Sequence, residues 1–313
     1  MRFFDAAAVR ELLTPTRCIE AMDRAMRATS AGRVDRPLRR FFDVGGSETN
    51  FGLMPGAAID CGLVGVKAIT AVPSNAERGL PFIQGVVLVF DIEDGRPVAA
   101  MDGAEITAIR TAAASGLATR ELSRPDARTL GIFGTGVQAA SHLDAMRAVR
   151  PVEDVLVWGR RAEAVEQFCT AQSARHEDIR IRGAEAEDVA ACDIVCTVTS
   201  ATTAVLCGAW LQPGAHLNLV GTHTPDAREV DAEAVARSRV YVDAMASAEQ
   251  EAGDLLIAQQ EGATKGLALG EIGQVLLGEV PGRQFVEDIT LYKSVGLVPQ
   301  DIFAAAAILA AAG

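Results

Sequence analysis

A glycine-rich turn, set between a predicted strand and a predicted helix, constrains the fold of this chain more than any other feature. The apolar run "RTLGIF" leads into "GTGVQA", so Gly134, Gly136 and Ala139 form a G-x-G-x-x-A pattern. The first glycine permits a tight bend, the second lets backbone approach a pyrophosphate, and the small third residue allows close helix packing. Amides at the helix start then receive the anion. A turn without a ligand is the alternative. The expected cofactor contacts are Gly134, Thr135, Gly136, Val137 and Gln138.

The sequence around this turn alternates between strand-like and helix-like segments. After the turn come the strand-like runs "EDVLVW", "IRIRG", "DIVCTVT", "HLNLVG" and "VYVDA", with helical patterns between several of them. Such alternation predicts a doubly wound parallel sheet covered by helices on both faces, a Rossmann-like α/β fold. A chain of 313 residues is long enough for a second domain beside it.

The end of the second predicted strand bears on the choice of nicotinamide cofactor. A cofactor with a free ribose 2′-hydroxyl usually meets a carboxylate there. Instead "VLVWGRR" offers Arg160 and Arg161, with no acidic residue before Glu163. Two guanidinium groups suit a 2′-phosphate through charge-assisted hydrogen bonds. We therefore expect NADP(H) to be preferred, with NAD(H) possible. The alternative is that both arginines point into solvent at the helix start.

The first 122 residues have a different texture. Residues 1–29 show apolar positions at helical spacing. Residues 36–100 hold short runs rich in valine, isoleucine and glycine, bounded by turn signals such as "EDGRP". The pattern predicts helices followed by an antiparallel or mixed sheet. Residues 103–122 return to a helical pattern, and the chain ends in an alanine-rich helix. These segments predict a second domain of the α+β class.

Composition excludes several classes of partner. With 29 basic and 41 acidic residues the net charge is −12, which argues against nucleic acid and anionic membranes. The N-terminal "MRFFDAAAVRELL" does not have the pattern of a signal peptide, and no apolar run has the length of a bilayer span. The six cysteines form no CxxC pair and the four histidines no metal-ligand spacing. We expect a cytoplasmic protein without a metal.

Several further segments occur in the order expected for one known family. The chain resembles ornithine cyclodeaminase and mu-crystallin in "PLRRFFD", "FGLMPG", "GVKAITAVP", "MDGAEITAIRTAAASG", "VGTHTPDAREV" and "LYKSVG", over nearly its whole length. The resemblance implies a homodimer that acts on a small α-amino or α-imino acid with a nicotinamide cofactor. It also implies that residues 1–122 with 290–313 form a substrate-binding and dimerisation domain, and residues 123–289 the Rossmann domain.

The same resemblance implies roles for charged residues. Arg110, the only arginine in "AIRTAAASG", looks like the family's substrate-carboxylate residue. Arg39 and Lys67 look like its companions, with Arg40 as the neighbour that could replace Arg39. A guanidinium can hold a carboxylate bidentately, and clustered cations are costly to bury without an anion. Asp226 matches the catalytic aspartate, suited to proton transfer; a simple turn aspartate is the alternative. Lys67 could bind the carboxylate or activate water.

Weaker implications concern the rest of the site. The family loops near the cofactor correspond here to Thr199, Gly221, Lys293 and Ser294, with Ser200, Thr222 and Gly296 beside them. The pocket wall is expected from strand residues such as Met54, Phe82 and Val86, whereas Gln84 reads as an ordinary strand glutamine.

One position departs from the family pattern. Typical ornithine cyclodeaminases have an acidic residue just before "LMP", suited to a substrate's distal ammonium, but this chain has Gly52 there, with Glu48 nearby. Without an acidic partner a desolvated ammonium is poorly matched. The leading hypothesis is therefore an NAD(P)H-dependent reductase of α-imino acids or an amino-acid dehydrogenase. The alternatives are a true ornithine cyclodeaminase, which recycles its cofactor, and a non-catalytic NADPH-dependent binding protein.

Overall fold

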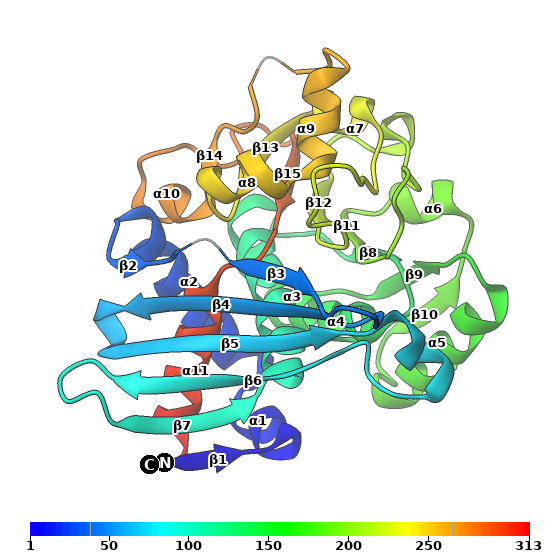
Figure 1. Cartoon of the computed structure of the whole chain (residues 1–313). Coiled ribbons are helices and arrows are strands. Elements are labelled where there is room, and N and C mark those ends of the chain that lie inside the picture. The colour runs from blue at the N-terminus through cyan, green and yellow to red at the C-terminus, as the bar shows by residue number, and fades with distance from the viewer. Residues whose placement is uncertain (38, 265) are drawn as a thin grey trace. The chain divides into compact units, whose positions relative to one another are not determined.

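The computed structural model describes residues 1–37, 39–264 and 266–313 (Figure 1). Its internal contacts divide the chain into two compact units. Residues 1–110 with 296–313 form what we call the first unit, and residues 111–295 form the second unit. The division falls inside helix α3 (Gly103–Leu122), whereas the sequence predicted boundaries after residue 122 and at residue 290. Because α3 is one continuous helix, its sequence pattern gives no sign of a change at residue 110.

The first unit is built on a seven-stranded mixed sheet with the order β1-β7-β6-β5-β4-β2, in which β3 also pairs with β4. Its strands are β1 (Arg2–Phe4), β2 (Val34–Asp35), β3 (Arg40–Asp43), β4 (Asn50–Ala58), β5 (Leu63–Ala71), β6 (Ile83–Asp91) and β7 (Pro97–Asp102). All neighbours are antiparallel except β1 and β7. The helix predicted over residues 1–29 is wrong at residues 2–4, because the β-favouring "RFF" pairs with β7 as an edge strand.

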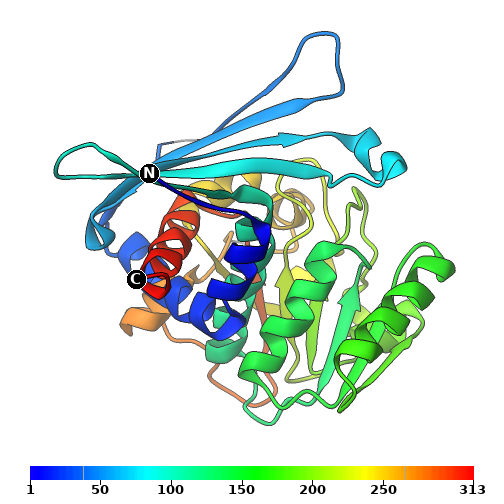
Figure 2. The ribbon, with the colours of Figure 1, turned by 90° about the horizontal axis from the view of Figure 1, so that it is seen from below.

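Helices cover one face of this sheet (Figure 2). They are α1 (Ala6–Leu12), α2 (Pro15–Ser30) and α11 (Val298–Ala311). Helix α2 begins where the Thr14 side chain caps it and Pro15 occupies its first position. Helix α11 contacts α2 and strands β4, β5 and β6. The C-terminal helix therefore belongs to the same core as the first 110 residues.

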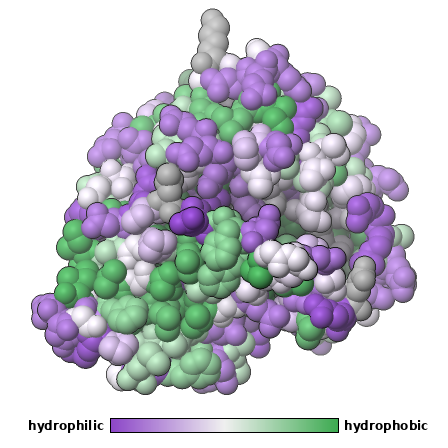
Figure 3. All heavy atoms as spheres, viewed as in Figure 1, coloured by the Kyte–Doolittle hydropathy of each residue, from purple (hydrophilic) through white to green (hydrophobic). Residues whose placement is uncertain are grey.

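The other face of the sheet is apolar as well. Side chains alternate along β4, β5 and β6, and those that point away from the helices are half-buried or exposed. They include Phe51, Leu53, Pro55, Val64, Val66, Val86, Leu88 and Phe90. Figure 3 shows apolar residues gathered toward the lower left, where Figure 1 places strands β4 to β7. A solvated face of an antiparallel sheet is usually polar, so this face has the composition of an interface.

The second unit contains an eight-stranded, all-parallel sheet with the order β10-β9-β8-β11-β12-β15-β13-β14. Its strands are β8 (Thr129–Phe133), β9 (Asp154–Trp158), β10 (Arg180–Gly183), β11 (Ile194–Thr197), β12 (His216–Leu219), β13 (Ser238–Val242), β14 (Gly270–Glu271) and β15 (Ile289–Lys293). Its helices are α4 (Val137–Val149), α5 (Ala162–Arg175), α6 (Ala186–Ala190), α7 (Ala232–Ala236), α8 (Met245–Glu251), α9 (Gly253–Gln260) and α10 (Ile272–Leu277). The strand order reverses beside β8, which confirms the predicted doubly wound fold.

Two apolar cores lie on the two faces of this sheet. Along β11, Ile194 and Cys196 belong to one core and Val195 belongs to the other, because successive side chains point to opposite faces. The first core also holds Leu143 of α4 and Phe168 of α5. The second holds residues of α6, α7 and α9. In the described part of the chain, no helix has the length and apolar composition needed to cross a membrane.

Candidate active site

Two buried cations share one carboxylate in the first unit. Lys67 Nζ lies 3.1 Å from Asp301 Oδ1 and 3.0 Å from Oδ2. Arg110 Nε donates to Asp301 Oδ1 at 3.1 Å. The side chains of Lys67, Arg110 and Asp301 are 1%, 6% and 0% exposed. Lys67 and Arg110, predicted as companions, therefore meet inside one cluster that carries one more positive than negative charge.

Each member comes from a different element. Lys67 lies on β5, where strand alternation turns it toward the helices together with Met54, its direct partner on β4. Arg110 lies on α3, and Asp301 lies in the first turn of α11. A carboxylate in the first turn of a helix is favoured by the helix dipole. The sheet face and the two helices thus bring the three groups to one point.

Burial controls the acid–base behaviour of Lys67. Desolvation, together with the positive charges of Arg110 and Arg39, lowers the pKa of Lys67 to about 8, and Asp301 opposes this shift. Arg39 is therefore close enough to act on Lys67. Arg40 is exposed and pairs with Leu53, on the opposite face of the sheet from Lys67. Of the two neighbouring arginines, Arg39 is the one whose charge acts on Lys67.

The C-terminal segment cradles the Arg110 guanidinium. Gln300, fully buried in the first turn of α11, accepts a hydrogen bond from Arg110 Nη1 through its side-chain oxygen. Gly296 has a φ of 81°, and a Cβ there would lie 2.9 Å from Nη1 and 3.0 Å from Nη2. Gln300 and Asp301 are functional candidates that the sequence reasoning missed. Their signal was two polar residues at the start of an otherwise apolar helix.

An aromatic ring occupies the place beside Gly52. Gly52 pairs with Phe41 of β3, and a Cβ on Gly52 would lie 2.3 Å from the Phe41 ring. The Arg39 guanidinium carbon lies 5.5 Å from the centre of the same ring, the geometry of a cation–π contact. Met54 shares this inner face and is 4% exposed. Val86 points to the outer face and Phe82 is 51% exposed, so these two do not line the inner face with Met54.

In the second unit, the glycine loop has the form that a pyrophosphate needs. Gly134 has a φ of 121°, and a Cβ there would lie 2.9 Å from the carbonyl oxygen of Val198. A Cβ on Gly136 would meet open space, with nothing within 4 Å. Gly136 is also the N-cap residue of α4, and among the described residues no side-chain hydrogen bond caps this helix. Thr135 and Gln138 are partly exposed and Val137 is 70% exposed, so the predicted cofactor residues surround an accessible helix start.

The loop also lies next to the two arginines. The Gly134 amide donates to the Trp158 carbonyl at 2.8 Å, which joins the ends of β8 and β9. A Cβ on Gly159 would lie 3.2 Å from Thr135 Cγ2. Arg160 and Arg161 follow directly and are exposed at the start of α5. The predicted diphosphate and 2′-phosphate contacts therefore lie on one edge of the sheet.

A second buried network ties together the loops after β11 and β12. Glu229 Oε1 accepts from Thr199 N and Oγ1, both at 2.7 Å, and Glu229 Oε2 accepts from Gly221 N at 2.7 Å. Burial, and then the Asp254 charge, raise the pKa of Glu229 against the opposing effects of Lys293 and Thr199. Thr199 and Gly221, predicted as cofactor contacts, are thus held side by side by a carboxylate that the sequence reasoning missed.

Lys293 belongs to the same network. Its Nζ is hydrogen-bonded to Thr222 O at 2.7 Å, Thr222 Oγ1 at 2.9 Å and Asp254 Oδ2 at 2.7 Å. Burial would raise the pKa of Asp254, but the Lys293 charge and several hydrogen bonds hold it below its usual value. Lys293 is fully buried and three acceptors use its three protons. The contact of Lys293 with a cofactor stays a prediction.

Two further predicted residues lie in the second unit. Ser294 is 3% exposed, and its hydroxyl donates to Asp243 Oδ2 at 3.4 Å. Asp226 is exposed in the segment between β12 and α7, three residues before Glu229. Both follow strands of the parallel sheet, at the edge where ligands of such folds bind.

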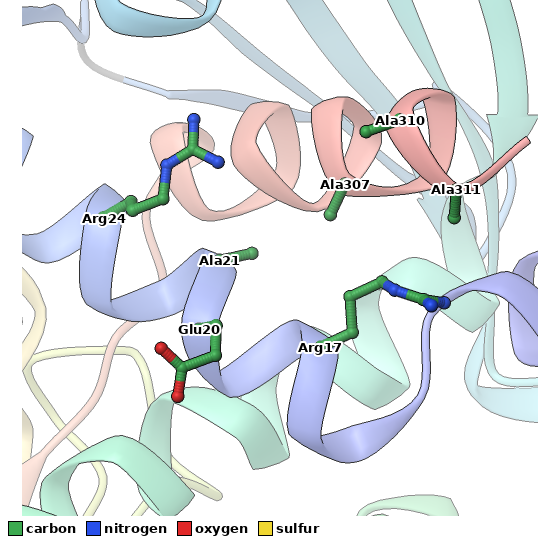
Figure 4. Close-up of a pocket in the computed structure, with 7 residues that line it drawn as sticks. All are labelled: Arg17, Glu20, Ala21, Arg24, Ala307, Ala310 and Ala311. Carbon is green, nitrogen blue, oxygen red and sulfur yellow. The ribbon is translucent and has the colours of Figure 1, made fainter. Parts of the chain in front are cut away.

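A pocket between α2 and α11 lies elsewhere (Figure 4). It is lined by Arg17, Glu20, Ala21, Arg24, Ala307, Ala310 and Ala311. None of the predicted site residues takes part. Among the described residues, no group of three or more histidine, cysteine or acidic side chains could hold a metal ion.

Comparison with protein families matches residues 2–312 to the ornithine cyclodeaminase/mu-crystallin family. The Δ(1)-pyrroline-2-carboxylate reductase of Bacillus cereus is 35% identical over 308 residues, which cover 97% of this chain and 94% of that protein. Similarity of this extent runs through both units.

Two solved structures share the whole fold. The Δ(1)-pyrroline-2-carboxylate reductase of Thermococcus litoralis, in complex with NADH and L-proline, is 33% identical with a TM-score of 0.95, covering 100% of this chain and 97% of that one. An archaeal alanine dehydrogenase dimer with bound NAD is 27% identical with a TM-score of 0.92, covering 100% and 96%.

Proposed function

This chain belongs to the ornithine cyclodeaminase/mu-crystallin family, and from that premise we propose that it reduces a small cyclic α-imino acid with NADPH or NADH. Relatives named as a pyrroline-2-carboxylate reductase and an alanine dehydrogenase support the predicted class, an oxidoreductase of imino and amino acids. The observation that carries the proposal is the cluster of Lys67 and Arg110 around the single carboxylate of Asp301.

The cluster is suited to the carboxylate of an α-imino acid. Two buried cations with one counter-ion leave a positive charge that is costly without a further anion. The substrate carboxylate supplies that anion. Arg110 and Lys67 hold it through charge-assisted hydrogen bonds, and Arg39 completes the group from the strand edge. Fixing the carboxylate fixes Cα, the carbon that must accept the hydride.

Reduction of an imine also requires a proton on nitrogen. The nicotinamide, when bound, supplies the hydride that Cα gains. We assign the proton to Asp226, because it is a carboxylate at the ligand-binding edge of the parallel sheet. Lys67 holds the carboxylate, and its lowered pKa also suits it to proton exchange near neutral pH. The two roles separate in D226N, which should lose kcat, and in K67M, which should raise KM.

The wall around Gly52 favours a reductase over ornithine cyclisation. Phe41 fills the space that a side chain at position 52 would need, so this part of the inner face presents an aromatic ring. An apolar wall suits an uncharged ring better than the distal ammonium of ornithine, which would lose hydration without gaining a carboxylate. A cyclic imine or a small keto acid with an amine is the substrate class that fits.

The second unit supports binding of the cofactor. The glycine loop offers a positive-φ turn, open space at Gly136 and an uncapped helix start, all of which fit a diphosphate. Arg160 and Arg161 support a preference for NADPH, because their exposed guanidinium groups follow the β9 strand beside that loop. We propose Lys293 as a structural residue of the loops after β11 and β12, which places Thr199 and Gly221 for the cofactor.

The apolar outer face of the first unit supports a homodimer. Phe51, Leu53, Val66 and Leu88 form a continuous face on neighbouring strands. A second copy of the same sheet is the natural complement, and the alanine dehydrogenase with the same fold is described as a dimer. The first unit thus holds the substrate and the dimer contact, and the second holds the cofactor. L53E should give monomers in sedimentation analysis.

The test of the function is the fate of the cofactor. We expect stoichiometric oxidation of NADPH, followed at the reduced-nicotinamide absorbance, with Δ1-pyrroline-2-carboxylate, Δ1-piperideine-2-carboxylate, or pyruvate with methylamine. Proline formed from ornithine with catalytic NAD(P)+ and no net cofactor change would establish the cyclodeaminase instead. Tight NADPH binding without turnover of any of these compounds would favour the non-catalytic NADPH-dependent binding protein.

A further inference from the structure

The first turn of α11 carries a fully buried carboxylate, Asp301. We infer that Asp301 is the positioning residue of the substrate-carboxylate site: it holds Lys67 and Arg110 at a fixed separation and leaves them one net positive charge. The inference rests on the proposed function, because one net charge is the complement of one carboxylate.

The geometry shows a counter-ion that both cations share through one oxygen, Oδ1. Asp301 Oδ1 accepts hydrogen bonds from Arg110 Nε and Lys67 Nζ, each at 3.1 Å. Asp301 Oδ2 lies 3.0 Å from the same Nζ. The two cations come from β5 and α3, and neither contacts the other in the hydrogen bonds that the structure shows for them. The carboxylate is therefore the group that bridges them.

Arg110 is oriented as well as neutralised. Gln300 accepts from Nη1, next to Asp301, which accepts from Nε. Gly296 packs against both terminal nitrogens, so closely that a Cβ would lie 2.9 Å from one of them. A guanidinium fixed at Nε and Nη1 cannot rotate about its last bond without losing these contacts. The six residues from 296 to 301 thus form one cradle for the substrate-binding arginine.

Asp301 also controls the charge of Lys67. The groups that act on Lys67 are Arg110 from α3, Asp301 from α11 and Arg39 from the edge of β3, with Thr107 Oγ1 at 3.4 Å. Burial and the two arginines lower its pKa to about 8, and Asp301 alone opposes them. The charges of Arg110 and Asp301 also act on Cys18 of α2. Its thiol stays protonated because burial raises its pKa. Without Asp301, Lys67 would lose its proton at a lower pH than it does in the wild type.

D301N is the direct test, because it keeps the shape and removes the charge. With Δ1-pyrroline-2-carboxylate and NADPH, we expect the alkaline limb of the kcat/KM profile to move down by at least about one pH unit. KM should rise about tenfold or more at pH 8, with a smaller change in kcat. D301E, which keeps the charge, should restore the position of the limb. A wild-type profile in folded D301N overturns the inference.

The matched control is D254N in the second unit. Asp254 is the buried partner of Lys293, so this variant removes a comparable ion pair far from α11 in sequence. We expect it to lower the unfolding temperature without moving the alkaline limb. An equal shift of the limb in D254N would mean that the D301N effect reports general damage, and it would also overturn the inference.

Two further measurements cover other failures. If D301N does not fold, Q300E adds a second carboxylate beside Arg110, and it should raise KM about tenfold; an unchanged KM overturns the inference. If none of the tested imines causes the wild type to oxidise NADPH, the proposed function fails. The stability difference between D301N and D301N/K67M then still tests the charge of Lys67. It should begin to rise at a lower pH than the difference between wild type and K67M does, because a lysine that is neutral in the folded protein regains its proton on unfolding. A rise that begins at the same pH, or no rise, contradicts the inference.

Discussion

Each unit of the molecule contains a fully buried lysine paired with a fully buried aspartate, and the two pairs have opposite surroundings. Lys67–Asp301 has an arginine as its third member, so positive charge is in excess. Lys293–Asp254 has Glu229 beside it, so acidic side chains are in excess. Because both pairs are buried, burial and ion pairing alone do not distinguish a binding site from a structural one. The two networks differ in the sign of the charged groups that are in excess and in the groups that bind them.

The surplus of acidic groups in the second unit is satisfied by hydrogen bonds within the protein. Glu229 accepts hydrogen bonds from Thr197, Thr199 and Gly221, and Asp254 accepts from the Glu229 amide at 2.6 Å. Backbone amides and hydroxyls absorb the extra negative charge, as expected of a group that fastens loops. The surplus around Lys67 and Arg110 is positive, and a bound carboxylate is what completes it. The first network is therefore functional in our proposal, and the second is structural.

The largest expected effect is on catalysis in R110M. Removal of the guanidinium leaves Lys67 and Asp301 as a neutral pair and takes away the bidentate partner of the substrate. We expect kcat/KM for Δ1-pyrroline-2-carboxylate to fall by about 10²–10³-fold, since a lost charge-assisted contact costs about 2–5 kcal/mol. R10M is the matched control, because Arg10 pairs with Glu105 at an exposed site. A fall of less than about threefold in R110M would remove the cluster from the substrate site.

The next effect is on stability, and here the two lysines should differ in sign. K293M leaves Asp254 and Glu229 buried together without a cation, which we expect to cost about 3–5 kcal/mol. K67M leaves the balanced pair of Arg110 and Asp301, and we expect unfolding free energy within about 1 kcal/mol of wild type, or higher. Urea unfolding at pH 7 measures both. Equal losses would show that the excess of charge does not distinguish the two networks.

A third effect follows from the pKa of Lys67. Its folded value of about 8 is below the ordinary 10.5, so the unfolded chain binds more protons between these values. The stability of wild type relative to K67M should therefore rise as pH increases from 8 to 10.5, by about 3 kcal/mol at most. Burial raises the pKa of thiols such as Cys196 to about 12. These thiols make the folded protein less stable as pH rises over an overlapping range. They are common to both proteins, so only the difference between wild type and K67M tests Lys67. A flat difference would contradict the lowered pKa of Lys67 in the folded protein.

The two units also differ in what their sequence could predict. The glycine loop, the parallel sheet and the arginines after β9 depend on neighbours within about 30 residues, so local patterns sufficed. The cluster in the first unit joins residues 234 and 191 positions apart, and no local pattern pairs Lys67 or Arg110 with Asp301. Their resemblance to a family suggested the two cations but not the carboxylate. Glu229 and Asp254 were missed for the same reason. Lys293, predicted as a cofactor contact, donates hydrogen bonds to Thr222 and Asp254 in this structure.

The smallest expected effect concerns the exposed cations, Arg160 and Arg161. If burial gives the Arg110 cluster its strength, two exposed arginines should contribute less per charge, because water and salt screen them. We expect R160S/R161S to lower kcat/KM for NADPH by about tenfold, with less than about a threefold change for NADH. The NADPH effect should shrink in about 0.5 M salt, whereas the R110M effect should not. R182S, at an exposed arginine of β10, is the control. Equal losses with both cofactors would place the two arginines at the shared diphosphate, and a wild-type preference for NADH would refute the predicted choice of NADPH.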